Sequence, residues 1–517
     1  MKIRKILFYT VIFILIWVYL ATFNEFDFDL WARLAVGKIF LETGQVLKND
    51  IFSYTTTKPI WIDHEWGSGV IFYFLADHFG DVGLLLLKII GTFLVLFLIS
   101  KIIQLQNIKP NKHLNLLWYF LVFLAIFNGV ASTVRCQLFT FIFFTLWIYV
   151  LERVRRGENR LLWILPSTCL IWANLHGGFV SGLGLIGIYG IGEFLNKKPF
   201  KKYFLILIPS VLITLINPYG VKYWQYIINA LYMQRTTIAE WMPTSLFGPF
   251  EEWQWFKIIL ILSIISIIFS FVKQRLKFKD LDKVKYLLIL VSLYMAMRHI
   301  KHQPFFAIAA GSFLYYDFYR IFSSVRDFIV LKVGEIADKI LKKAALIKDI
   351  TVYTFIIIVG SLIILGTPMQ ISVPDYKYPV QAVEFVKQNN LSGNLLAPFH
   401  WGSYMAWNLH PQCLIAIDGR YEEVYPEEID KLTANFDYVL DKNWYDFLKK
   451  YHTDILILDK RLDSYQAILN IKFWKKIYDD KISAVFVPIH TVKNSYTIPK
   501  MEEHQVEKYS TAINFLD

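Results

Sequence analysis

Long apolar runs alternate with short polar or basic segments from Ile6 to about Met369. Many of these runs approach the length of about 20 residues at which an α-helix crosses the hydrocarbon core of a bilayer. The pattern therefore predicts a polytopic α-helical membrane protein with about 11 transmembrane helices. The expected spans lie near residues 6–23, 82–104, 115–131, 138–151, 161–174, 178–195, 203–216, 256–272, 286–297, 303–317 and 351–367.

Two apolar segments need a separate interpretation. The run that begins at Ile6 follows a charged start like that of a signal peptide, but it has no small-residue cleavage site and continues into Phe26. We interpret it as a retained span. The segment Trp66–His78 is too short to cross and is expected to be a re-entrant or interfacial helix. If it crossed instead, every later loop would change sides.

Basic residues gather in alternate loops between the expected spans. With the N-terminus inside, the inner loops carry about 27 Lys and Arg side chains and the outer loops of the membrane part about 9, as the positive-inside rule requires. The expected location is thus the bacterial cytoplasmic (inner) membrane, with a cytoplasmic N-terminus. The expected domains are a transmembrane domain, residues 1–368, whose outer first loop is 24–81, and an extracytoplasmic domain, residues 369–517.

Composition supports this class and excludes others. Hydrophobic residues make up 56% of the 517 residues and charged residues 19%, which is too apolar for a soluble protein of this size. The net charge of +12 lies mainly in loops between spans, so nucleic acid is not an expected partner. Cys136, Cys169 and Cys413 form no disulfide or metal pattern.

From Pro379 the chain has the composition of a small α/β domain. Helices are expected at Val380–Asn389 and Trp444–Tyr451, and strands at Leu395–Phe399, Cys413–Asp418, Asp454–Asp459 and Ala484–Ile489. This alternation favours a partly parallel sheet. Asp418 and Arg420 follow one strand, where ligands often bind. The structural alternative is an Asp-Gly turn with an arginine ion pair.

Unusual polar residues fall on the predicted outer side of the membrane part. Asp27 and Asp29 follow the first span directly, and acids at the edge of a bilayer are costly without a partner. The other candidates for substrate binding on this side are His64, Glu65, Lys88, Arg135, His176, Glu240, Arg298, Lys301 and His302. A one-sided set of acids, histidines and cations indicates a cavity that is open to the outside.

Each candidate also has a structural interpretation. Asp27 and Asp29 suit the start of an interfacial helix, because aspartate is a favoured N-cap residue. His176 lies beside two glycines that indicate a turn or close helix packing. The side chains of Arg135 and Arg298 are long enough to reach the interface from within a span.

The candidate residues match one chemistry well. A loop aspartate can act as general base on an acceptor hydroxyl, and Asp-x-Asp can instead hold a divalent cation against a phosphate. Arginine and lysine stabilise a lipid-linked phosphate as a leaving group. Outside the cell there is no nucleotide supply, so a polyprenyl-phosphate sugar is the expected donor. No phosphate-binding loop and no nucleophilic-serine motif occurs in a fitting context.

Four short motifs then support a family resemblance. They are Asp-x-Asp-x-Trp at Asp27–Trp31, His-Glu-Trp at His64–Trp66, Asn-Leu-His-Gly at Asn174–Gly177 and Asn-Pro-Tyr-Gly at Asn217–Gly220. In this order they resemble a group of poorly characterised bacterial relatives of the protein O-mannosyltransferases and the lipid A aminoarabinose transferases. These proteins are type C membrane glycosyltransferases. Ala32-Arg33 departs from the pattern, because relatives commonly have Trp-His after the first tryptophan.

The resemblance implies an activity and a catalytic residue. An acid in the first outer loop is the catalytic base of this superfamily, and Asp27 or Asp29 occupies that place. The implied reaction is an inverting transfer of a hexosyl or pentosyl group from a polyprenyl-phosphate donor to a hydroxyl, in the cell envelope. The alternative is a non-catalytic or transporting protein, such as a glycan-lipid flippase or an assembly factor. The sugar, the acceptor and the need for a metal are left open.

Overall fold

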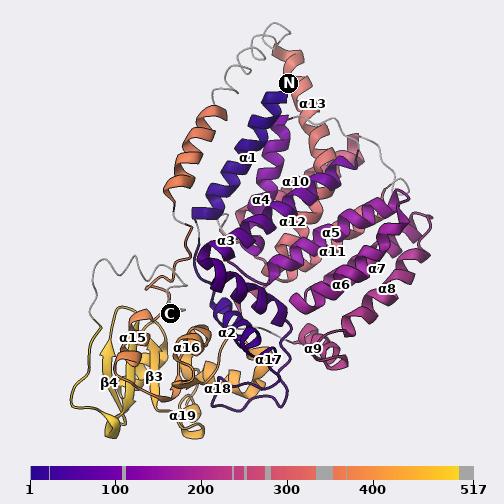
Figure 1. The fold of residues 1–517 in the computed structure, drawn as a ribbon. Coiled ribbons are helices and arrows are strands. Elements are labelled where there is room, and N and C mark those ends of the chain that lie inside the picture. The colour runs from indigo at the N-terminus through magenta and orange to yellow at the C-terminus, as the bar shows by residue number, and fades with distance from the viewer. Residues whose placement is uncertain are drawn as a thin grey trace. The chain divides into compact units, whose positions relative to one another are not determined.

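The computed structural model describes residues 2–22, 24–106, 112–233, 235, 238–249, 253–273, 281–333, 353–367 and 369–499 (Figure 1). The chain divides into two compact units. The first contains residues 1–24, 86–216 and 233–369, and the second contains residues 25–85, 217–232 and 370–517. The loop that follows the first helix therefore groups with the C-terminal part of the chain.

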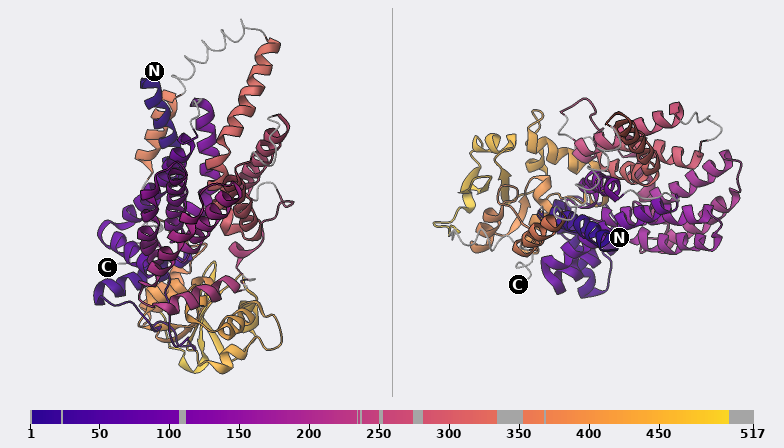
Figure 2. Two further views of the ribbon diagram at one scale, coloured as in Figure 1. Left: turned by 90° about the vertical axis from the view of Figure 1, so that its right-hand side faces the viewer. Right: turned by 90° about the horizontal axis from the view of Figure 1, so that it is seen from above.

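The first unit is helical. Its elements are α1 (Lys2–Thr22), α4 (Lys112–Val130), α5 (Gln137–Arg155), η1 (Asn159–Trp163), α6 (Ile164–Leu175), α7 (Phe179–Leu195), α8 (Lys201–Leu212), η2 (Ile213–Leu215), η3 (Ala239–Trp241), α10 (Gln254–Lys273), α11 (Lys283–Arg298), η5 (Ile300–His302), α12 (Gln303–Phe313), α13 (Tyr315–Val333) and a helix at Tyr353–Gly366. Helices α5 to α8 pack side by side, as Figures 1 and 2 show.

Within the described residues, three helices are long and apolar enough to cross a membrane: Trp66–Gln104, Gln137–Arg155 and Gln254–Val272. Shorter apolar helices lie at Thr10–Thr22, Leu117–Val130, Phe179–Leu195 and Tyr353–Gly366. These helices confirm the predicted membrane class, while the number of spans and their orientation stay predictions. The span expected at 303–317 differs, because α12 ends at Phe313 and α13 begins at Tyr315.

Helix α3 (Trp66–Gln104) contains both the short segment Trp66–His78 and the next expected span. The two parts meet at Gly80, whose φ of 64° and ψ of −156° break the helix. Glycine adopts this conformation without the steric cost that a Cβ atom imposes. The short segment is thus helical, as predicted.

The second unit contains α2 (Phe28–Thr43), the first part of α3, and α9 (Val221–Tyr232). Helices α2 and α3 approach closely at Gly37, where an added Cβ would lie 2.1 Å from the carbonyl oxygen of Gly69. The pattern of apolar spans did not predict α9. Its polar residues Lys222 and Gln225 are exposed, which gives the helix an amphipathic rather than a membrane-spanning pattern.

The C-terminal part of the second unit has a five-stranded sheet with the order β2-β1-β3-β5-β4. Its strands are β1 (Gly393–Leu396), β2 (Cys413–Ile415), β3 (Ile455–Asp459), β4 (Trp474–Asp479) and β5 (Ser483–Pro488). Strand β1 is parallel to β2 and β3, and β5 is antiparallel to β3 and β4. In register, Leu395 pairs with Ile415 and Ile455, and Leu456 pairs with Phe486. This confirms the partly parallel sheet.

Helices cover the sheet. They are α15 (Val380–Gln388), α16 (Phe399–Leu409), α17 (Tyr421–Val424), α18 (Glu427–Tyr438), α19 (Asp446–Lys450), α20 (Asp463–Leu469) and the short η6 (Ile489–Thr491). Every residue of β3 and β5 is buried, so both faces of the central strands are covered. Phe436, Phe447 and Tyr465 form the core on one face.

The prediction for this domain missed strand β4 and the helices α16, α17, α18 and α20. Strand β4 lies at the edge, and its exposed Lys475 and Lys476 hide the strand pattern. The strand expected to end at Phe399 ends at Leu396, and Phe399 begins α16 instead. Small and polar residues such as Gly402 and Ser403 obscure the helical pattern there.

Backbone hydrogen bonds attach the first loop to this domain. The amide of Ile415 in β2 donates to the carbonyl of Phe52 (2.8 Å), and Tyr54 donates to the carbonyl of Ile415 (3.1 Å). Phe26 donates to the carbonyl of Ser372 over 2.8 Å. The loop and the sheet therefore position each other's side chains.

Candidate active site

The Asp-x-Asp motif forms the beginning of α2. Asp27 is the N-cap, with φ −86° and ψ 143°, and its Oδ1 accepts a hydrogen bond from the amide of Asp29 over 3.1 Å. Asp29 lies in the first turn, where the helix dipole stabilises a negative charge. The helix ends at Gly44, whose φ of 68° is left-handed. The capping interpretation therefore holds for Asp27, whereas Asp29 is placed by the helix.

Aromatic packing fixes the loop in front of this helix. The rings of Phe26 and Trp31 are stacked with centroids 3.7 Å apart, and Trp31 is completely buried. The hydroxyl of Tyr378 donates to the carbonyl of Phe26 over 2.9 Å. Asp27 and Asp29 themselves are half-buried. The two acids are thus held on a rigid support and keep some access to solvent.

Asp29 lies at the carboxyl end of the parallel strands. A Cβ built on Gly419, which follows β2, would stand 2.7 Å from Asp29 Oδ1 and 3.5 Å from the hydroxyl oxygen of Ser403. Helix α16, which carries Ser403, packs against α2. The sequence indicated that this sheet edge was a place for polar groups, and the structure brings the first-loop acid to it.

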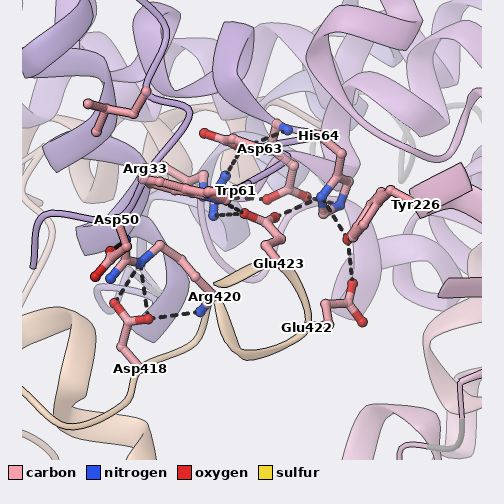
Figure 3. Close-up of polar contacts among 12 residues, drawn as sticks. Arg33, Asp50, Trp61, Asp63, His64, Tyr226, Asp418, Arg420, Glu422 and Glu423 are labelled. Atoms are coloured by element: carbon pink, nitrogen blue, oxygen red, sulfur yellow. Dashed lines mark hydrogen bonds and ion pairs between the residues drawn. The ribbon is translucent and has the colours of Figure 1, made fainter. Parts of the chain in front are cut away.

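Arg33, one turn further along α2, is the centre of a buried ion cluster (Figure 3). Its guanidinium contacts Asp63 in a short ion pair and lies 3.5 Å from carboxylate oxygens of both Glu65 and Glu423. Only 4% of Arg33 is exposed. Burying a charge is costly unless it is paired, so these carboxylates account for its position. Arg33 therefore binds acids of its own chain.

His64 extends the same cluster. Its Nδ1 lies 2.7 Å from Glu423 Oε1 and 3.1 Å from the hydroxyl of Tyr226 in α9, and its Nε2 lies 3.6 Å from Glu65 Oε1. Tyr226 also donates to Glu422 over 3.0 Å. Burial by itself lowers the pKa of His64, but the carboxylates of Glu65 and Glu423 raise it to about 9. Unless another cation replaces its proton, His64 is positively charged at neutral pH.

The pKa values of two acids in the cluster, Asp63 and Glu423, shift in opposite directions. Burial raises the pKa of the Asp63 carboxyl to about 6, although the nearby Arg33 favours the charged form. The pKa of Glu423, by contrast, is lowered: burial acts to raise it, but Arg33 and His64 outweigh that effect. Neighbouring acids therefore respond differently because Glu423 is in contact with both cations.

Asp418 and Arg420 form a separate buried group. Arg420 donates to Asp418 through Nε (2.8 Å) and to Asp50 through Nη1 (2.6 Å). Its guanidinium lies 4.8 Å from the ring centroids of both Phe52 and Trp61. Arg420 is 2% exposed and Asp418 is fully buried. This geometry favours the structural alternative, an ion pair that joins the first loop to the sheet.

Two predicted residues of the first unit, Lys301 and His302, lie around Trp241 together with Arg235 and His299, which were not among the predicted candidates. Lys301 Nζ lies 3.6 Å and Arg235 Cζ 4.0 Å from the centroid of the Trp241 ring, which are cation–π distances. His299 Nδ1 donates to the Trp241 carbonyl over 2.6 Å, and the ring of His302 is 5.9 Å away.

Arg135 forms a short ion pair with Glu240, the residue before Trp241. Burial acts to raise the pKa of Glu240, but Arg135 and Lys301 hold it below its ordinary value. The structure thus brings Arg135, Glu240, Lys301 and His302 together. Arg298 lies in the last turn of α11, where a cation suits the helix dipole.

Lys88 and His176 have other surroundings. Lys88, in α3, is 1% exposed and donates to the side-chain oxygen of Asn24 in a short hydrogen bond. His176 ends α6, and its Nδ1 accepts from the amide of Gly178 (2.9 Å) and lies 2.7 Å from the hydroxyl of Thr140. These contacts support the structural interpretation of the His-Gly-Gly turn.

The sequence patterns did not select Asp63, Glu422, Glu423 or Tyr226, which complete the cluster around Arg33 and His64. Glu422 and Glu423 directly follow Tyr421, and two adjacent acids are typical of an exposed helix start. Only 4% of Glu423 is exposed, however. Tyr226 lies in the unpredicted α9. The one available signal was Asp63, an acid next to His64 in an otherwise aromatic segment.

One group of side chains has the arrangement of a metal site. Among the described residues, His64, Glu65 and Glu423 place one ligand atom each within 4.8 Å of one another. Asp27 and Asp29 do not belong to that group. A cation held by the Asp-x-Asp motif therefore stays a prediction.

No family model and no curated protein matches the chain significantly. Solved structures do match. The oligosaccharyltransferase of Archaeoglobus fulgidus in its apo form aligns over 87% of this chain and 69% of its own, with 10% identity and a TM-score of 0.57. AglB from the same organism, in complex with an inhibitory peptide and a dolichol-phosphate, covers the same shares with 11% identity and a TM-score of 0.55. The chain thus shares the fold of these two oligosaccharyltransferase structures.

Proposed function

We propose that this protein is a membrane glycosyltransferase that moves a sugar from a polyprenyl-phosphate donor to a hydroxyl of an extracytoplasmic acceptor. One observation carries the proposal: Asp29, in the first turn of α2, lies at the carboxyl end of the parallel strands of the sheet, in a fold that oligosaccharyltransferases share. An acid so placed suits proton abstraction from a bound hydroxyl.

Asp29 is the proposed general base. Its carboxylate accepts the proton of the acceptor hydroxyl while the hydroxyl oxygen attacks the anomeric carbon of the donor sugar. The bond between that carbon and the phosphate oxygen breaks, and polyprenyl phosphate leaves with its electron pair. Attack opposite the leaving group inverts the anomeric carbon. Asp27 supports the reaction by capping α2 and fixing the backbone of Asp29.

The cations around Trp241 are the proposed phosphate-binding residues. Lys301 and Arg235 both place their positive charge against the ring of Trp241. Arg298 precedes Lys301 by three residues in the sequence. Positive groups aimed at a leaving phosphate stabilise the charge that develops on it. The binding of dolichol-phosphate by AglB supports a lipid phosphate as the ligand.

The proposed setting is the cytoplasmic membrane of a bacterium, with the N-terminus inside and residues 369–517 outside. The charge bias of the loops supports this orientation. The proposed sugar is a hexose or a pentose.

Donor consumption by the purified protein tests the proposal. Full-length protein in proteoliposomes is incubated with radiolabelled polyprenyl-phosphate sugars and bacterial membrane fractions as acceptors. We expect label to move from the lipid to an acceptor, with release of polyprenyl phosphate, and no transfer from nucleotide sugars. If no panel member is consumed and undecaprenyl phosphate does not bind in native mass spectrometry, the proposal is wrong.

A further inference from the structure

We propose that His64, Glu65 and Glu423 form a binding site for one divalent transition-metal cation of the Zn²⁺ type. The ligands come from two distant segments of the second unit: the end of the first loop and α17. Figure 3 shows His64 and Glu423 facing each other beside Arg33. The inference does not depend on the proposed transferase activity.

The three residues place one ligand atom each in a small volume. His64 Nε2 and Glu65 Oε1 are 3.6 Å apart, and the three ligand atoms lie within 4.8 Å of one another. Two ligands bonded to Zn²⁺ at about 2.1 Å in a tetrahedron are about 3.4 Å apart. One ring nitrogen of His64 serves a single cation, so binding requires a side-chain rotation that brings Glu423, now 2.7 Å from Nδ1, to the same nitrogen as Glu65. Solvent or a further group supplies the fourth ligand.

The charges of the cluster favour a bound cation. Among the described residues of this group, the four carboxylates of Asp63, Glu65, Glu422 and Glu423 face three basic groups, those of Arg33, Lys58 and His64. An excess of negative charge away from water is costly unless another positive charge offsets it. A divalent cation bound between His64, Glu65 and Glu423 would supply this charge.

Surrounding groups hold the proposed ligands in position. The indole of Trp61 donates to Glu423 Oε2 over 2.8 Å, and the hydroxyl of Tyr226 lies between His64 and Glu422. Trp61 is fully buried. Metal sites use such outer contacts to orient their ligands, and these contacts raise metal affinity. A fortuitous cluster on a mobile surface would lack this support.

The donor set selects among cations. One imidazole nitrogen with two carboxylates suits Zn²⁺ or Mn²⁺, whereas Mg²⁺ and Ca²⁺ prefer oxygen ligands. We therefore expect Zn²⁺ to bind most tightly, Mn²⁺ more weakly, and Mg²⁺ weakest of the three.

Isothermal titration of the full-length protein in nanodiscs tests the site. The protein is treated with EDTA, dialysed, and titrated with ZnCl₂, MnCl₂ or MgCl₂, and bound zinc is counted by elemental mass spectrometry. The expected result is one tight Zn²⁺ per chain, with affinity at least about tenfold lower in His64→Gln, Glu65→Gln and Glu423→Gln. Glu65→Gln keeps the size of the side chain and serves if a variant at a more buried position fails to fold.

An exposed histidine–carboxylate pair provides the matched control. His78 and Asp77 lie 3.5 Å apart and are about half exposed, so His78→Gln is expected to keep the tight site. Equal Zn²⁺ affinity in the wild type, Glu65→Gln and Glu423→Gln would overturn the proposal, as would the absence of tight Zn²⁺ binding to the wild type.

Discussion

Asp29 and Gly419 lie directly against each other although they come from opposite ends of the sequence. A Cβ atom added at Gly419 would stand 2.7 Å from Asp29 Oδ1, a distance that real side chains essentially never show. The proposed base is thus placed by α2 on one side and by the loop after β2 on the other. This contact makes the C-terminal domain part of the proposed chemistry.

Substitution Gly419→Ala is therefore expected to displace the Asp29 carboxylate. Proton abstraction depends on placement within hydrogen-bond reach, so we predict that sugar transfer falls roughly 10- to 100-fold, while the KM for the lipid donor stays within about twofold. The measurement is steady-state transfer in proteoliposomes. Gly184→Ala is the control, because an added Cβ there meets nothing within 4 Å. Unchanged transfer by Gly419→Ala would show that the contact has no catalytic role.

Loss of Arg33 is expected to destabilise the second unit. The variant Arg33→Gln leaves Asp63, Glu65 and Glu423 without the central cation, and breaking a buried ion pair costs about 3–5 kcal/mol. Thermal unfolding of the purified protein should show a clear drop in Tm. Arg153→Gln removes a partly exposed ion pair with Glu158 and should change Tm little. Equal Tm values for the two variants would contradict the account of Arg33.

Lys301 is expected to contribute to lipid-phosphate binding. We predict that Lys301→Gln raises the KM for the polyprenyl-phosphate donor about tenfold, because a charged contact to phosphate contributes about 1.5–3 kcal/mol in favourable cases. The control Lys431→Gln removes an exposed cation of α18 that pairs with Glu427. A KM that does not change in Lys301→Gln would remove this residue from the donor site.

The pH dependence of stability should include a contribution from Asp437. Burial raises the pKa of this α18 carboxyl to about 7, while the hydrogen bond from the Phe399 amide acts in the opposite direction. A raised carboxyl pKa means that the folded state binds the proton more tightly than the unfolded state. The contribution of Asp437 to the free energy of unfolding is fully present below about pH 4, and it is lost as the pH rises through about 7.

Asp437→Asn should remove this dependence. Between about pH 5 and pH 8, the Tm of the wild type should fall relative to that of the variant. Asp446→Asn, at a more exposed carboxyl paired with Lys449, serves as the control and should follow the wild type. Parallel Tm curves for the wild type and Asp437→Asn would show that this carboxyl does not titrate as described.

The sequence predicts the type of fold better than it predicts the site. A bilayer requires long apolar segments and favours basic residues in the inner loops, so the sequence alone predicts the membrane class. The N-cap role of Asp27 was also legible, because aspartate satisfies free amides at a helix start. In contrast, the local sequence predicts that Glu423 is exposed to solvent. Its burial depends on ion pairs with Arg33 and His64, which lie far away in the sequence.

Two predicted binding residues show the limit of local patterns most clearly. Asp418 and Arg420 follow a strand, as ligand-binding residues often do. Arg420, however, forms an ion pair with Asp50 and cation–π contacts with Phe52 and Trp61. Those partners come from the first loop. The sequence shows that the charged residues exist, and only the three-dimensional structure shows which of them pair with each other.

The variant Asp29→Asn tests most directly whether Asp29 is the general base. The variant should lower the rate of sugar transfer about 10²- to 10⁴-fold, with undecaprenyl phosphate still bound and Tm unchanged. Asp27→Asn is the matched control, because asparagine caps helices as well as aspartate does and should retain most of the activity. Full transfer by Asp29→Asn, in protein that binds the lipid normally, would contradict this role.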